Sequence, residues 1–376
     1  MRLLDEVKDS LPAHWYYDPA HYQRELKAVW YRDWVCVGRE ESLQRSGDYF
    51  VAPIGSQQLI VTRANDRGLR AFENSCRHRG SLLCRESSGR FRNNRIVCPY
   101  HTWTYSTEGE LLATPGKFPT DDFENENYSL YSVHVDTWRG FIFVNLAVEP
   151  ATSLLDFLGS EPDYLQNWPL EDLHTVHQET ISVACNWKVF WENYSECYHC
   201  PRIHPELCKV MPVYKKAVFD ASDLPGWEPA YDGDTGSGAV GNGARSWTLD
   251  GEISLPLIDG PTAEEIERGV IFSSVVGSMY VVGHPEYVRS VRIVPNGPES
   301  TNLVVDWLLP KSSEVADKSC LEPIIELARL VIQQDGDICE VNQQGMHSRS
   351  FEQGTLVPQE YELWDFHQWL RRKLDE

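Results

Sequence analysis

The stretch CRHRGSLLCRESSGRFRNNRIVCPYH, which runs from Cys76 to His101, decides how the first half of the chain folds. It opens with a Cys-x-His pair, Cys76 and His78, and closes with a Cys-x-x-His pair, Cys98 and His101, with 19 residues between the pairs. This donor set suits zinc, or a [2Fe-2S] cluster with two cysteines on one iron and two histidines on the other. Zinc fingers group like ligands, whereas both pairs here join unlike ones. The spacing therefore favours the cluster, with a zinc site or four structural residues as the alternatives.

Short alternating runs surround this stretch. Runs such as YFVAPIG, RIVCPYH and WRGFIFVNLA are separated by turn residues, which predicts a small all-β module. Further on, helical stretches alternate with strand-like runs such as EYVRSVRIVP and TNLVVDWLLP, which predicts an α+β domain built on an antiparallel sheet. We expect a helical segment at residues 1–37 that packs on this larger domain, the β domain at 38–148 and the α+β domain at 149–376.

A second group of metal-binding side chains lies in ENYSECYHCPRIHPELC, residues 192–208. Glu192, Glu196 and His199 are spaced by four and three residues, so a regular helix would place them on one face. His204 lies five residues beyond His199, which is about 140° away around an ideal helix. The helix must therefore be distorted if both imidazoles are to reach one ion.

Pro201, between the two histidines, accounts for such a distortion because it removes a backbone donor. Two histidines and one carboxylate on one face of an ion form the facial triad of non-haem Fe(II), which leaves positions open for O2. The carboxylate is expected from LARLVIQQDGDICEVNQQG, which offers Asp335 and Asp337 on a helical stretch. The Cys-x-x-Cys of Cys197 and Cys200 offers an alternative, since thiolates beside two imidazoles would close a tetrahedral structural zinc site.

Both constellations resemble those of one family. The Cys-x-His and Cys-x-x-His pairs resemble the Rieske signature, and NWKVFWENYSECYHCPRIHPEL resembles the catalytic motif of Rieske non-haem iron oxygenase large (alpha) subunits. The resemblance extends from about Cys36 to Gly345. It implies an all-β Rieske [2Fe-2S] domain followed by a catalytic domain of helices on an antiparallel sheet, of the helix-grip or START-like kind. It also implies a mononuclear iron held by His199, His204 and Asp335.

The resemblance also implies roles for particular carboxylates. Asp335 is preferred to Asp337 as the third ligand because the family's carboxylate precedes a glutamate and then a Gln-Gly pair. Glu196 stands at the position of a carboxylate that bridges two subunits of a head-to-tail homotrimer. There it would join His199 of one chain to His101 of the next and carry electrons between them. Most members have aspartate at this position, so the glutamate departs from the usual pattern.

The motif ECYHCxxxHPEL resembles that of a subgroup of oxygenases that act on quaternary ammonium compounds such as glycine betaine, carnitine and proline betaine. This resemblance implies a monooxygenase that hydroxylates an N-methyl group and so releases formaldehyde. Hydroxylation of an aromatic ring by the same iron chemistry is the alternative. A cationic substrate would be held by aromatic faces. The candidates are Trp191, Tyr198, Trp247, Tyr280 and Tyr287, although core packing would explain each of them alone.

The charge of the chain bears on its partners. A net charge of −22 with a pI near 4.9 argues against nucleic acid, because binding a phosphate polymer requires a basic surface. One segment differs, since eight arginines lie between Arg67 and Arg95. This Arg-rich segment is either a solvated face or a docking site for an acidic electron carrier or reductase. No GxGxxG follows a strand, so electrons from NAD(P)H must arrive through a separate reductase.

No secretory signal or membrane-spanning apolar run is visible, and a cytoplasmic enzyme without a membrane partner is therefore expected. The stretch AYDGDTGSGAVGNGARSW contains five glycines between Gly233 and Gly243. It is either a lid over the substrate or a plain surface loop.

Overall fold

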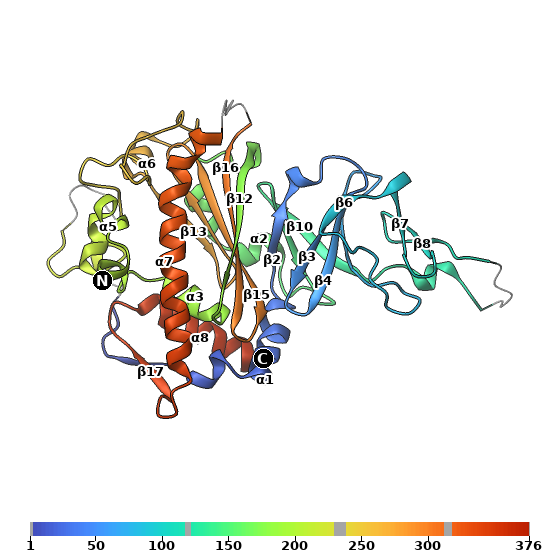
Figure 1. The fold of residues 1–376 in the computed structure, drawn as a ribbon, viewed down its shortest axis with the longest axis horizontal. Coiled ribbons are helices and arrows are strands. Elements are labelled where there is room, and N and C mark those ends of the chain that lie inside the picture. The colour runs from blue at the N-terminus through green and yellow to red at the C-terminus, as the bar shows by residue number, and fades with distance from the viewer. Residues whose placement is uncertain (1–2, 117–121, 229–237, 312–317, 376) are drawn as a thin grey trace. The chain divides into compact units, whose positions relative to one another are not determined.

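The computed structural model describes residues 3–116, 122–228, 238–311 and 318–375 (Figure 1). Its contacts divide the chain into two compact units. We call Val29–Phe157 the β unit, and Met1–Ala28 together with Leu158–Glu376 the α+β unit. The predicted β domain, residues 38–148, lies nine residues inside these limits at each end.

The β unit is built on antiparallel strands throughout its described residues. Its seven-stranded sheet has the order β2-β11-β10-β5-β4-β3-β6, and a separate three-stranded sheet has the order β7-β8-β9. The strands are β2 (Val35–Arg39), β3 (Asp48–Ile54), β4 (Gln57–Arg63), β5 (Leu69–Glu73), β6 (Ser88–Arg90), β7 (Arg95–Val97), β8 (Thr104–Ser106), β9 (Leu111–Ala113), β10 (Ser132–Trp138) and β11 (Phe141–Asn145). β-Branched and aromatic residues are frequent in the longer strands, such as β4, β10 and β11, as the alternating runs predicted.

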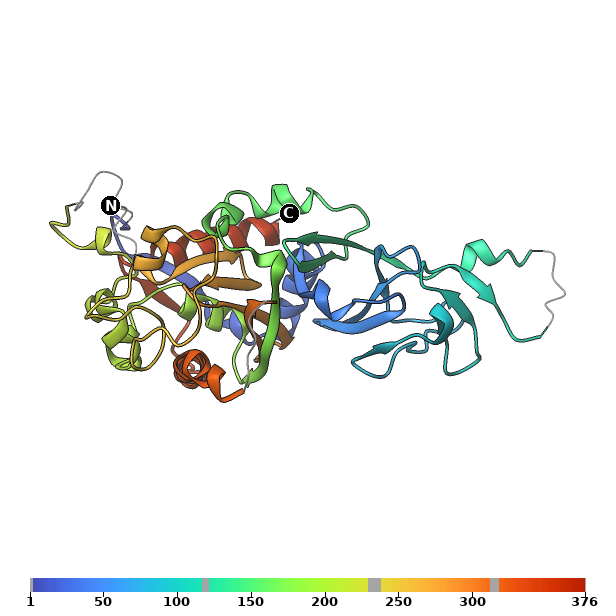
Figure 2. The same cartoon turned by 90° about the horizontal axis from the view of Figure 1, so that it is seen from above.

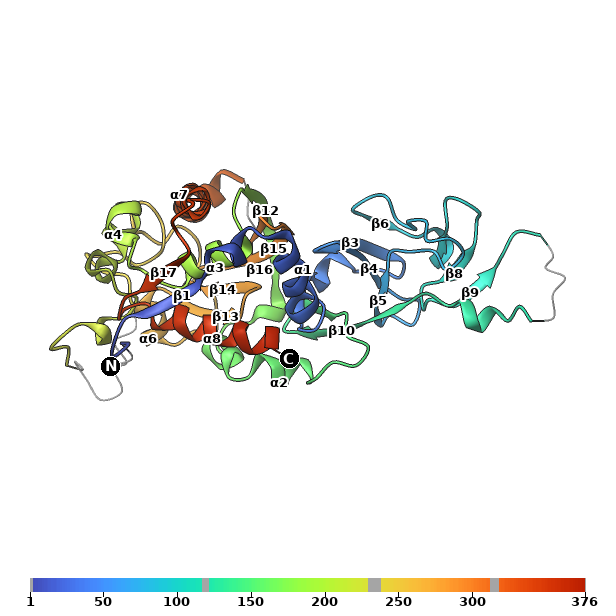
Figure 3. The same cartoon turned by 90° about the horizontal axis from the view of Figure 1, so that it is seen from below.

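The α+β unit is built on a five-stranded antiparallel sheet of order β12-β16-β15-β14-β13. Its strands are β12 (Leu173–Val183), β13 (Ile271–Val275), β14 (Met279–Gly283), β15 (Val288–Gly297) and β16 (Ser300–Pro310). The long helix α7 (Glu322–Met346) lies along one face of this sheet and is seen nearly end-on in Figures 2 and 3. The Trp307 indole of β16 donates a hydrogen bond to the Ile324 carbonyl of α7 at 3.0 Å. An all-β unit and helices on an antiparallel sheet give the predicted α+β class.

The smaller helices of the α+β unit surround this core. They are α1 (Pro19–Glu25), α3 (Trp187–Tyr194), α4 (Cys200–Ile203), α5 (Leu207–Val210), α6 (Ala263–Arg268) and α8 (Tyr361–Asp375), while α2 (Leu154–Leu158) lies where the two units join in sequence. Asn186 caps α3 by accepting a hydrogen bond from the Lys188 amide at 3.1 Å. Because no described helix has the length and apolar composition to cross a membrane, the chain offers no helical span there.

The N-terminal segment is helical only in part. It begins with the short strand β1 (Lys8–Pro12), which pairs with β17 (Gln353–Leu356), and continues into α1. The buried ammonium of Lys188 lies 2.6 Å from a Glu25 carboxylate oxygen, and the Trp187 indole donates to the other oxygen at 2.9 Å. The Asn-Trp-Lys part of the sequence motif thus fastens α3 to the segment that precedes the β unit.

The predicted glycine-rich lid falls largely on residues 229–237, which lie outside the described residues. Only its second part, residues 238–247, is described.

Candidate metal centres

The first candidate centre is formed by two loops of the β unit. In the loop after β5 the Cys76 amide donates to the Ser81 carbonyl at 2.9 Å, and in the loop between β7 and β8 the Cys98 amide donates to the Trp103 carbonyl at 2.8 Å. Each cysteine also accepts a hydrogen bond at its own carbonyl, from Gly80 and Thr102 respectively. The two loops are therefore closed by the same pair of backbone contacts and present their side chains alike.

The donor atoms of these loops are layered. Cys76 and Cys98 are buried, with 3% and 1% exposure, whereas His78 is exposed and His101 half-buried. The Nδ1 atoms of the two histidines lie 3.2 Å apart and face the same space. Two sulfurs inside and two ring nitrogens outside fit a [2Fe-2S] cluster with cysteines on one iron and histidines on the other. The structure thus brings together all four predicted cluster residues.

Two aromatic side chains support this group. The Tyr105 hydroxyl lies 3.3 Å from the Cys76 sulfur, and the Trp103 ring stacks on His78 with ring centroids 4.9 Å apart. Burial raises the pKa of the Cys76 thiol, although the Tyr105 hydrogen bond works against this. The Cys76 thiolate therefore depends on bound metal for its charge, as is usual for buried thiolate ligands.

The second candidate centre lies in the α+β unit, and the local structure there differs from the predicted regular helix. Helix α3 ends at Tyr194, and the Ser195 amide folds back onto the carbonyls of the last turn. The chain then turns and begins α4, with Pro201 in the first turn of that helix. Proline is well tolerated there because the first helical amides have no partner. The distortion that brings the imidazoles together is thus a break after α3, and Pro201 starts a helix instead of bending one.

This break places three donor atoms side by side. The Nε2 atoms of His199 and His204 are 3.1 Å apart, and an Asp335 carboxylate oxygen from α7 lies 2.8 Å from His204 Nε2 and 3.3 Å from His199 Nε2. Ligands on one face of an octahedral ion with bonds of about 2.1 Å are about 3.0 Å from each other. The three separations match that value, so the donor set fits a facial triad.

Neighbouring side chains orient these three residues. The amide of Asn193 donates to the Asp335 oxygen at 2.7 Å, and Nδ1 of His204 lies 2.8 Å from the Gln334 side-chain oxygen. Nδ1 of His199 lies 2.6 Å from Glu196. Each imidazole therefore has its second nitrogen held by an oxygen, an arrangement that fixes metal-binding histidines in proteins.

Electrostatics in this site favour a cation. Burial alone would lower the pKa of His199, but hydrogen bonds, above all with Asp335, outweigh it and raise that pKa to about 12. The pKa of His204 is also raised. Burial would raise the pKa of Asp335, yet the two imidazoles lower it to about 2. The carboxylates of Asp335 and Glu196 thus stabilise a positive charge at the point where the donor atoms meet.

The other candidate ligands lie differently. Asp337 is exposed and accepts a hydrogen bond from Gln333 on the same helix at 2.8 Å. Glu192 accepts from the Tyr16 hydroxyl at 2.7 Å and lies 2.9 Å from the His367 ring nitrogen. Its carboxylate therefore connects α3 to Tyr16, which precedes α1, and to His367 of α8, instead of to the triad.

The two cysteines of the Cys-x-x-Cys are buried beside the triad. The Cys200 sulfur lies 4.0 Å from His199 Nε2, and the donor atoms of Cys200, His199 and His204 lie within 4.8 Å of one another. Burial would raise the pKa of Cys200, but hydrogen bonds with Cys197 and His199 lower it to about 7. A closed zinc site would need both sulfurs, yet Cys197 does not belong to this group of donors, so the alternative has less support than the triad.

The five aromatic candidates do not form a single cage. Trp191 and Tyr280 stack at 4.6 Å between ring centroids. Trp247 and Tyr287 belong to a second cluster, joined when the Tyr287 hydroxyl donates to the Trp247 carbonyl at 3.3 Å. Tyr198 is exposed. The role of all five in a substrate pocket stays a prediction. Four of them are buried, as one pair of Trp191 with Tyr280 and another of Trp247 with Tyr287.

Several residues that surround the centre were missed in the sequence. Asn193 contacts Asp335, and Gln334 contacts His204. Neither contact can be read from the spacing of the residues, because it depends on the direction in which each side chain points. Tyr194 and Arg289 contact each other at 3.0 Å, from α3 and β15. No spacing in the sequence links these two positions. The sequence indicates only that polar residues flank each metal-binding motif.

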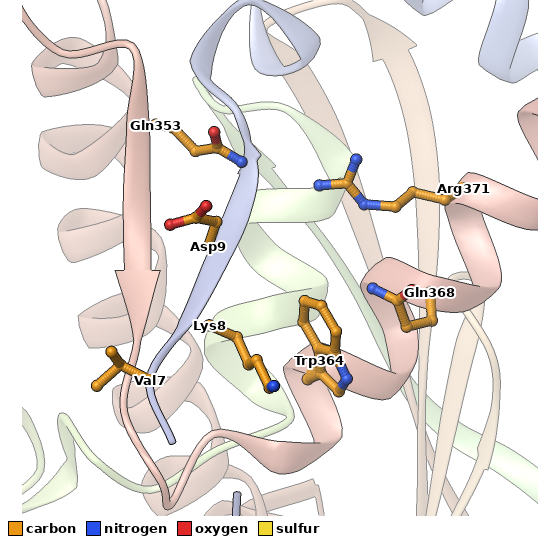
Figure 4. A pocket seen from close by; sticks show the side chains of 7 residues that line it. All are labelled: Val7, Lys8, Asp9, Gln353, Trp364, Gln368 and Arg371. Atoms are coloured by element: carbon orange, nitrogen blue, oxygen red, sulfur yellow. The ribbon is translucent and has the colours of Figure 1, made fainter. Parts of the chain in front are cut away.

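A surface cleft lies elsewhere in the α+β unit. Figure 4 shows this cleft of about 570 Å³ between β1, β17 and α8. Trp364 lines this cleft, and the Lys8 ammonium lies 5.6 Å from the centroid of the Trp364 ring. The lining residues are Val7, Lys8, Asp9, Gln353, Trp364, Gln368 and Arg371, and none of the predicted site residues is among them.

Both units of the chain match known families. Residues 33–124 match the Rieske [2Fe-2S] domain, and residues 170–376 match the ring hydroxylating alpha subunit (catalytic domain). The chain therefore belongs to the ring-hydroxylating alpha-subunit family of Rieske oxygenases. This confirms the predicted oxidoreductase class and its cofactors, which are a Rieske cluster, a mononuclear iron, O2 and an external source of electrons.

Relatives and solved structures extend over nearly the whole chain. The glycine betaine monooxygenase oxygenase subunit of Chromohalobacter salexigens is 29% identical over 96% of this chain and 84% of its own length. The chloroplastic choline monooxygenase of Atriplex hortensis is 26% identical over 98% of this chain and 79% of its own. The quaternary ammonium Rieske monooxygenase CntA in complex with L-carnitine has the same fold, with a TM-score of 0.73, 22% identity and coverage of 97% and 96%. The same holds for the naphthalene 1,2-dioxygenase of Rhodococcus sp., with a TM-score of 0.76, 21% identity and coverage of 98% and 95%.

Proposed function

We propose that this protein is the terminal oxygenase component of an N-demethylase that acts on a quaternary ammonium substrate of the betaine type. The observation that carries the proposal is the meeting of His199, His204 and Asp335 in the geometry of a facial triad. The substrate class is supported by relatives whose names refer to glycine betaine, choline and carnitine. These relatives favour N-methyl hydroxylation over the alternative, hydroxylation of an aromatic ring.

In this proposal Cys76, His78, Cys98 and His101 hold the cluster, and the triad holds the iron. When bound, the iron supplies O2 activation with electrons delivered one at a time. The chain's own residues fix the imidazoles, exclude water and orient the N-methyl group. Two electrons, two protons and O2 convert the methyl group to N-hydroxymethyl with release of water. The hydroxymethyl adduct then divides into formaldehyde, a proton and the tertiary amine.

We further propose that the active form is a homotrimer in which Glu196 joins His199 to His101 of the neighbouring subunit. Two observations support this path. Glu196 already contacts the His199 ring at 2.6 Å, and the histidines of the first centre are at the surface of the β unit while its cysteines are buried. Electrons would thus enter at a centre whose exposed side can approach a partner.

A separate reductase is proposed to dock near the Arg-rich segment. Six of its eight arginines are exposed, among them Arg79, which directly follows His78. Charge-reversing Arg92→Glu should weaken reductase-driven turnover several-fold at low salt, and the difference should disappear at high salt. Unchanged salt dependence would remove the Arg-rich segment from the docking surface.

The reaction is tested with purified, iron-loaded protein and a reductase. Glycine betaine, carnitine, proline betaine and choline are supplied separately, and formaldehyde and the demethylated amine are measured by mass analysis. Formation of both in equal amounts with O2 consumption supports the proposal. Turnover of an aromatic hydrocarbon to a cis-diol or a phenol, with no formaldehyde from any ammonium compound, would show that the alternative holds.

A further inference from the structure

A buried arginine without a carboxylate partner lies in the α+β unit. Arg289 of β15 is fully buried, with 0% exposure. Its Nη2 donates to the Tyr194 hydroxyl at 3.0 Å, whereas Nε and Nη1 are buried and have no hydrogen-bond partner among the described residues. Within the described residues, no carboxylate lies within salt-bridge distance of this guanidinium. A full positive charge is thus present inside the protein without an anion to balance it.

Such an arrangement is costly unless a ligand completes it. A guanidinium keeps its proton at any physiological pH, and buried charges in proteins are normally paired. The Trp247 ring, 5.0 Å from the guanidinium carbon, compensates only part of this cost. An anion from outside the chain would satisfy both the charge and the unpartnered nitrogens.

The neighbouring residues cannot provide that anion. His284 stacks on Tyr287, and burial together with the Arg289 charge keeps its pKa well below the ordinary value, so the ring is neutral. The carboxylate of Glu286 accepts from the Ser246 hydroxyl at 2.8 Å and from the Ser254 amide at 2.9 Å. The acidic group nearest in sequence is therefore already engaged elsewhere.

Arg289 lies on the side of the sheet where the triad is built. It is in register with Trp307 of β16, whose indole contacts α7, and α7 carries Asp335. Its hydrogen-bond partner Tyr194 is the last residue of α3, and the residue before it, Asn193, donates to Asp335 at 2.7 Å. Two consecutive residues of one helix end thus contact the unpaired cation and the candidate iron ligand.

Aromatic rings continue from the same point. The Tyr194 ring lies 4.2 Å from that of Tyr280, between ring centroids, and Tyr280 stacks on Trp191. This surface suits the methylated ammonium end of a substrate. The Trp247 ring lies against Arg289 instead, at 5.0 Å from the guanidinium carbon.

We propose that Arg289 binds the carboxylate of a zwitterionic betaine, whose trimethylammonium end lies against Tyr194 and Tyr280 toward the triad. This rests on the proposed function and narrows it. Substrates with both a quaternary nitrogen and a carboxylate are accepted, whereas a cationic alcohol such as choline leaves the guanidinium unpaired. The cost of an unpaired buried charge, more than the loss of a contact, excludes the alcohol.

The test compares glycine betaine with choline on the iron-loaded, cluster-containing protein. Anaerobic binding to the wild-type protein should be at least about tenfold tighter for glycine betaine, because each buried charge pair contributes strongly to affinity. Equal affinities, or tighter binding of choline, would overturn the proposal without any variant. This measurement does not depend on turnover.

Arg289→Gln should weaken glycine betaine binding at least about thirtyfold and change choline binding less than about threefold. Arg289→Lys, which keeps the charge but loses the planar donor array, should show an intermediate loss for glycine betaine. Arg268→Gln is the matched control, since this arginine lies on α6 of the same unit and pairs with Glu264 at 3.6 Å. Equal losses for both ligands in Arg289→Gln and Arg289→Lys would mean that Arg289 only supports the fold.

Failure of the proposed function would look different. If wild-type protein binds glycine betaine in an Arg289-dependent manner but releases no formaldehyde, the carboxylate site stands and N-demethylation is wrong. If formaldehyde forms from choline and glycine betaine alike and Arg289→Gln does not alter their ratio, the enzyme class stands and the carboxylate site is wrong.

Discussion

The two metal centres of this chain are built in opposite ways. In the β unit four donors come from two short loops that share one backbone pattern, and the histidines face outward while the cysteines are buried. In the α+β unit three donors come from a helix break and from a helix about 130 residues later in the chain, and His204 and Asp335 are almost completely buried. In the proposed function the first centre would meet a partner through its histidines, and the second would carry out chemistry shielded from water.

The difference teaches how each centre is held. Backbone hydrogen bonds fix the two cysteines of the first centre, while Tyr105 and Trp103 contact Cys76 and His78. The second centre depends on polar side chains, because Asn193, Gln334 and Glu196 each hold one ligand. We therefore expect substitutions around the second centre to affect metal affinity, and substitutions around the first to affect mainly the ligands themselves.

The largest expected effect separates the two centres completely. His199→Ala should reduce turnover to background while the visible spectrum of the cluster remains unchanged, because the lost donor belongs to the other unit. Cys98→Ser is the reciprocal variant and should remove that spectrum while iron still binds to the triad. Metal analysis, absorption spectra and turnover are measured on both. Loss of both metals in either variant would mean that the centres are not independent.

Electron transfer between the centres is the next point to test. Glu196→Gln removes the charge but keeps a side-chain oxygen that can hold His199 Nδ1. Both metals should therefore be retained while transfer slows about 10- to 100-fold. Single-turnover measurements of cluster oxidation would report the change. Coupling of O2 use to product at the normal rate would exclude Glu196 from the path.

Mixed trimers provide the matching control. Chains that lack the cluster through Cys76→Ser are combined with chains that lack the iron through His204→Ala. Activity should partly return if electrons cross between subunits, and a mixture as inactive as its components would contradict the trimer.

A smaller effect tests how the second centre depends on its side-chain supports. Gln334→Leu removes the oxygen 2.8 Å from His204 Nδ1 and should weaken iron binding about 10- to 100-fold. The neighbouring Gln333→Leu is a suitable control because Gln333 is exposed and contacts Asp337. Iron affinity is measured by competition with a chelator. Equal affinity in the two variants would show that the Gln334 contact does not matter.

The mildest change is one of pH. In the metal-free protein the raised pKa of His199, about 12, means that this site holds a proton at neutral pH, which iron must displace. Iron affinity should therefore rise with pH, by about tenfold per unit for each proton released between about pH 6 and 8. Titrations in buffers of different ionisation enthalpy would count the proton. An affinity independent of pH in this range would show that none is displaced.

The sequence was informative where function is local. The paired Cys and His of the first centre lie within 26 residues, and their order alone selected the cluster, while alternation predicted the strands around them. His199 and His204 were found for the same reason. Asp335 was chosen over Asp337 through a family resemblance, since both acids lie on one helical stretch and only the packing of α7 makes one of them buried.

Other features depended on energies that spacing does not express. A regular helix through Glu192, Glu196 and His199 was wrong, because the helix ends at Tyr194 and the chain closes back on its last turn. The Arg289 contact with Tyr194 joins residues 95 positions apart on different elements. Its consequence, an unbalanced buried charge, is a property of the packed structure alone.

The pairing of Glu25 with Lys188 and Trp187 has a consequence for how the protein is made. Glu25 and Trp187 are 162 residues apart in the sequence. The whole β unit, Val29–Phe157, lies between them and is synthesised after Glu25 and before Trp187. The N-terminal segment must therefore wait, exposed, until α3 leaves the ribosome. A version without this segment would leave the buried Lys188 ammonium of α3 without its Glu25 partner, which should destabilise the larger unit by about 3 to 5 kcal/mol.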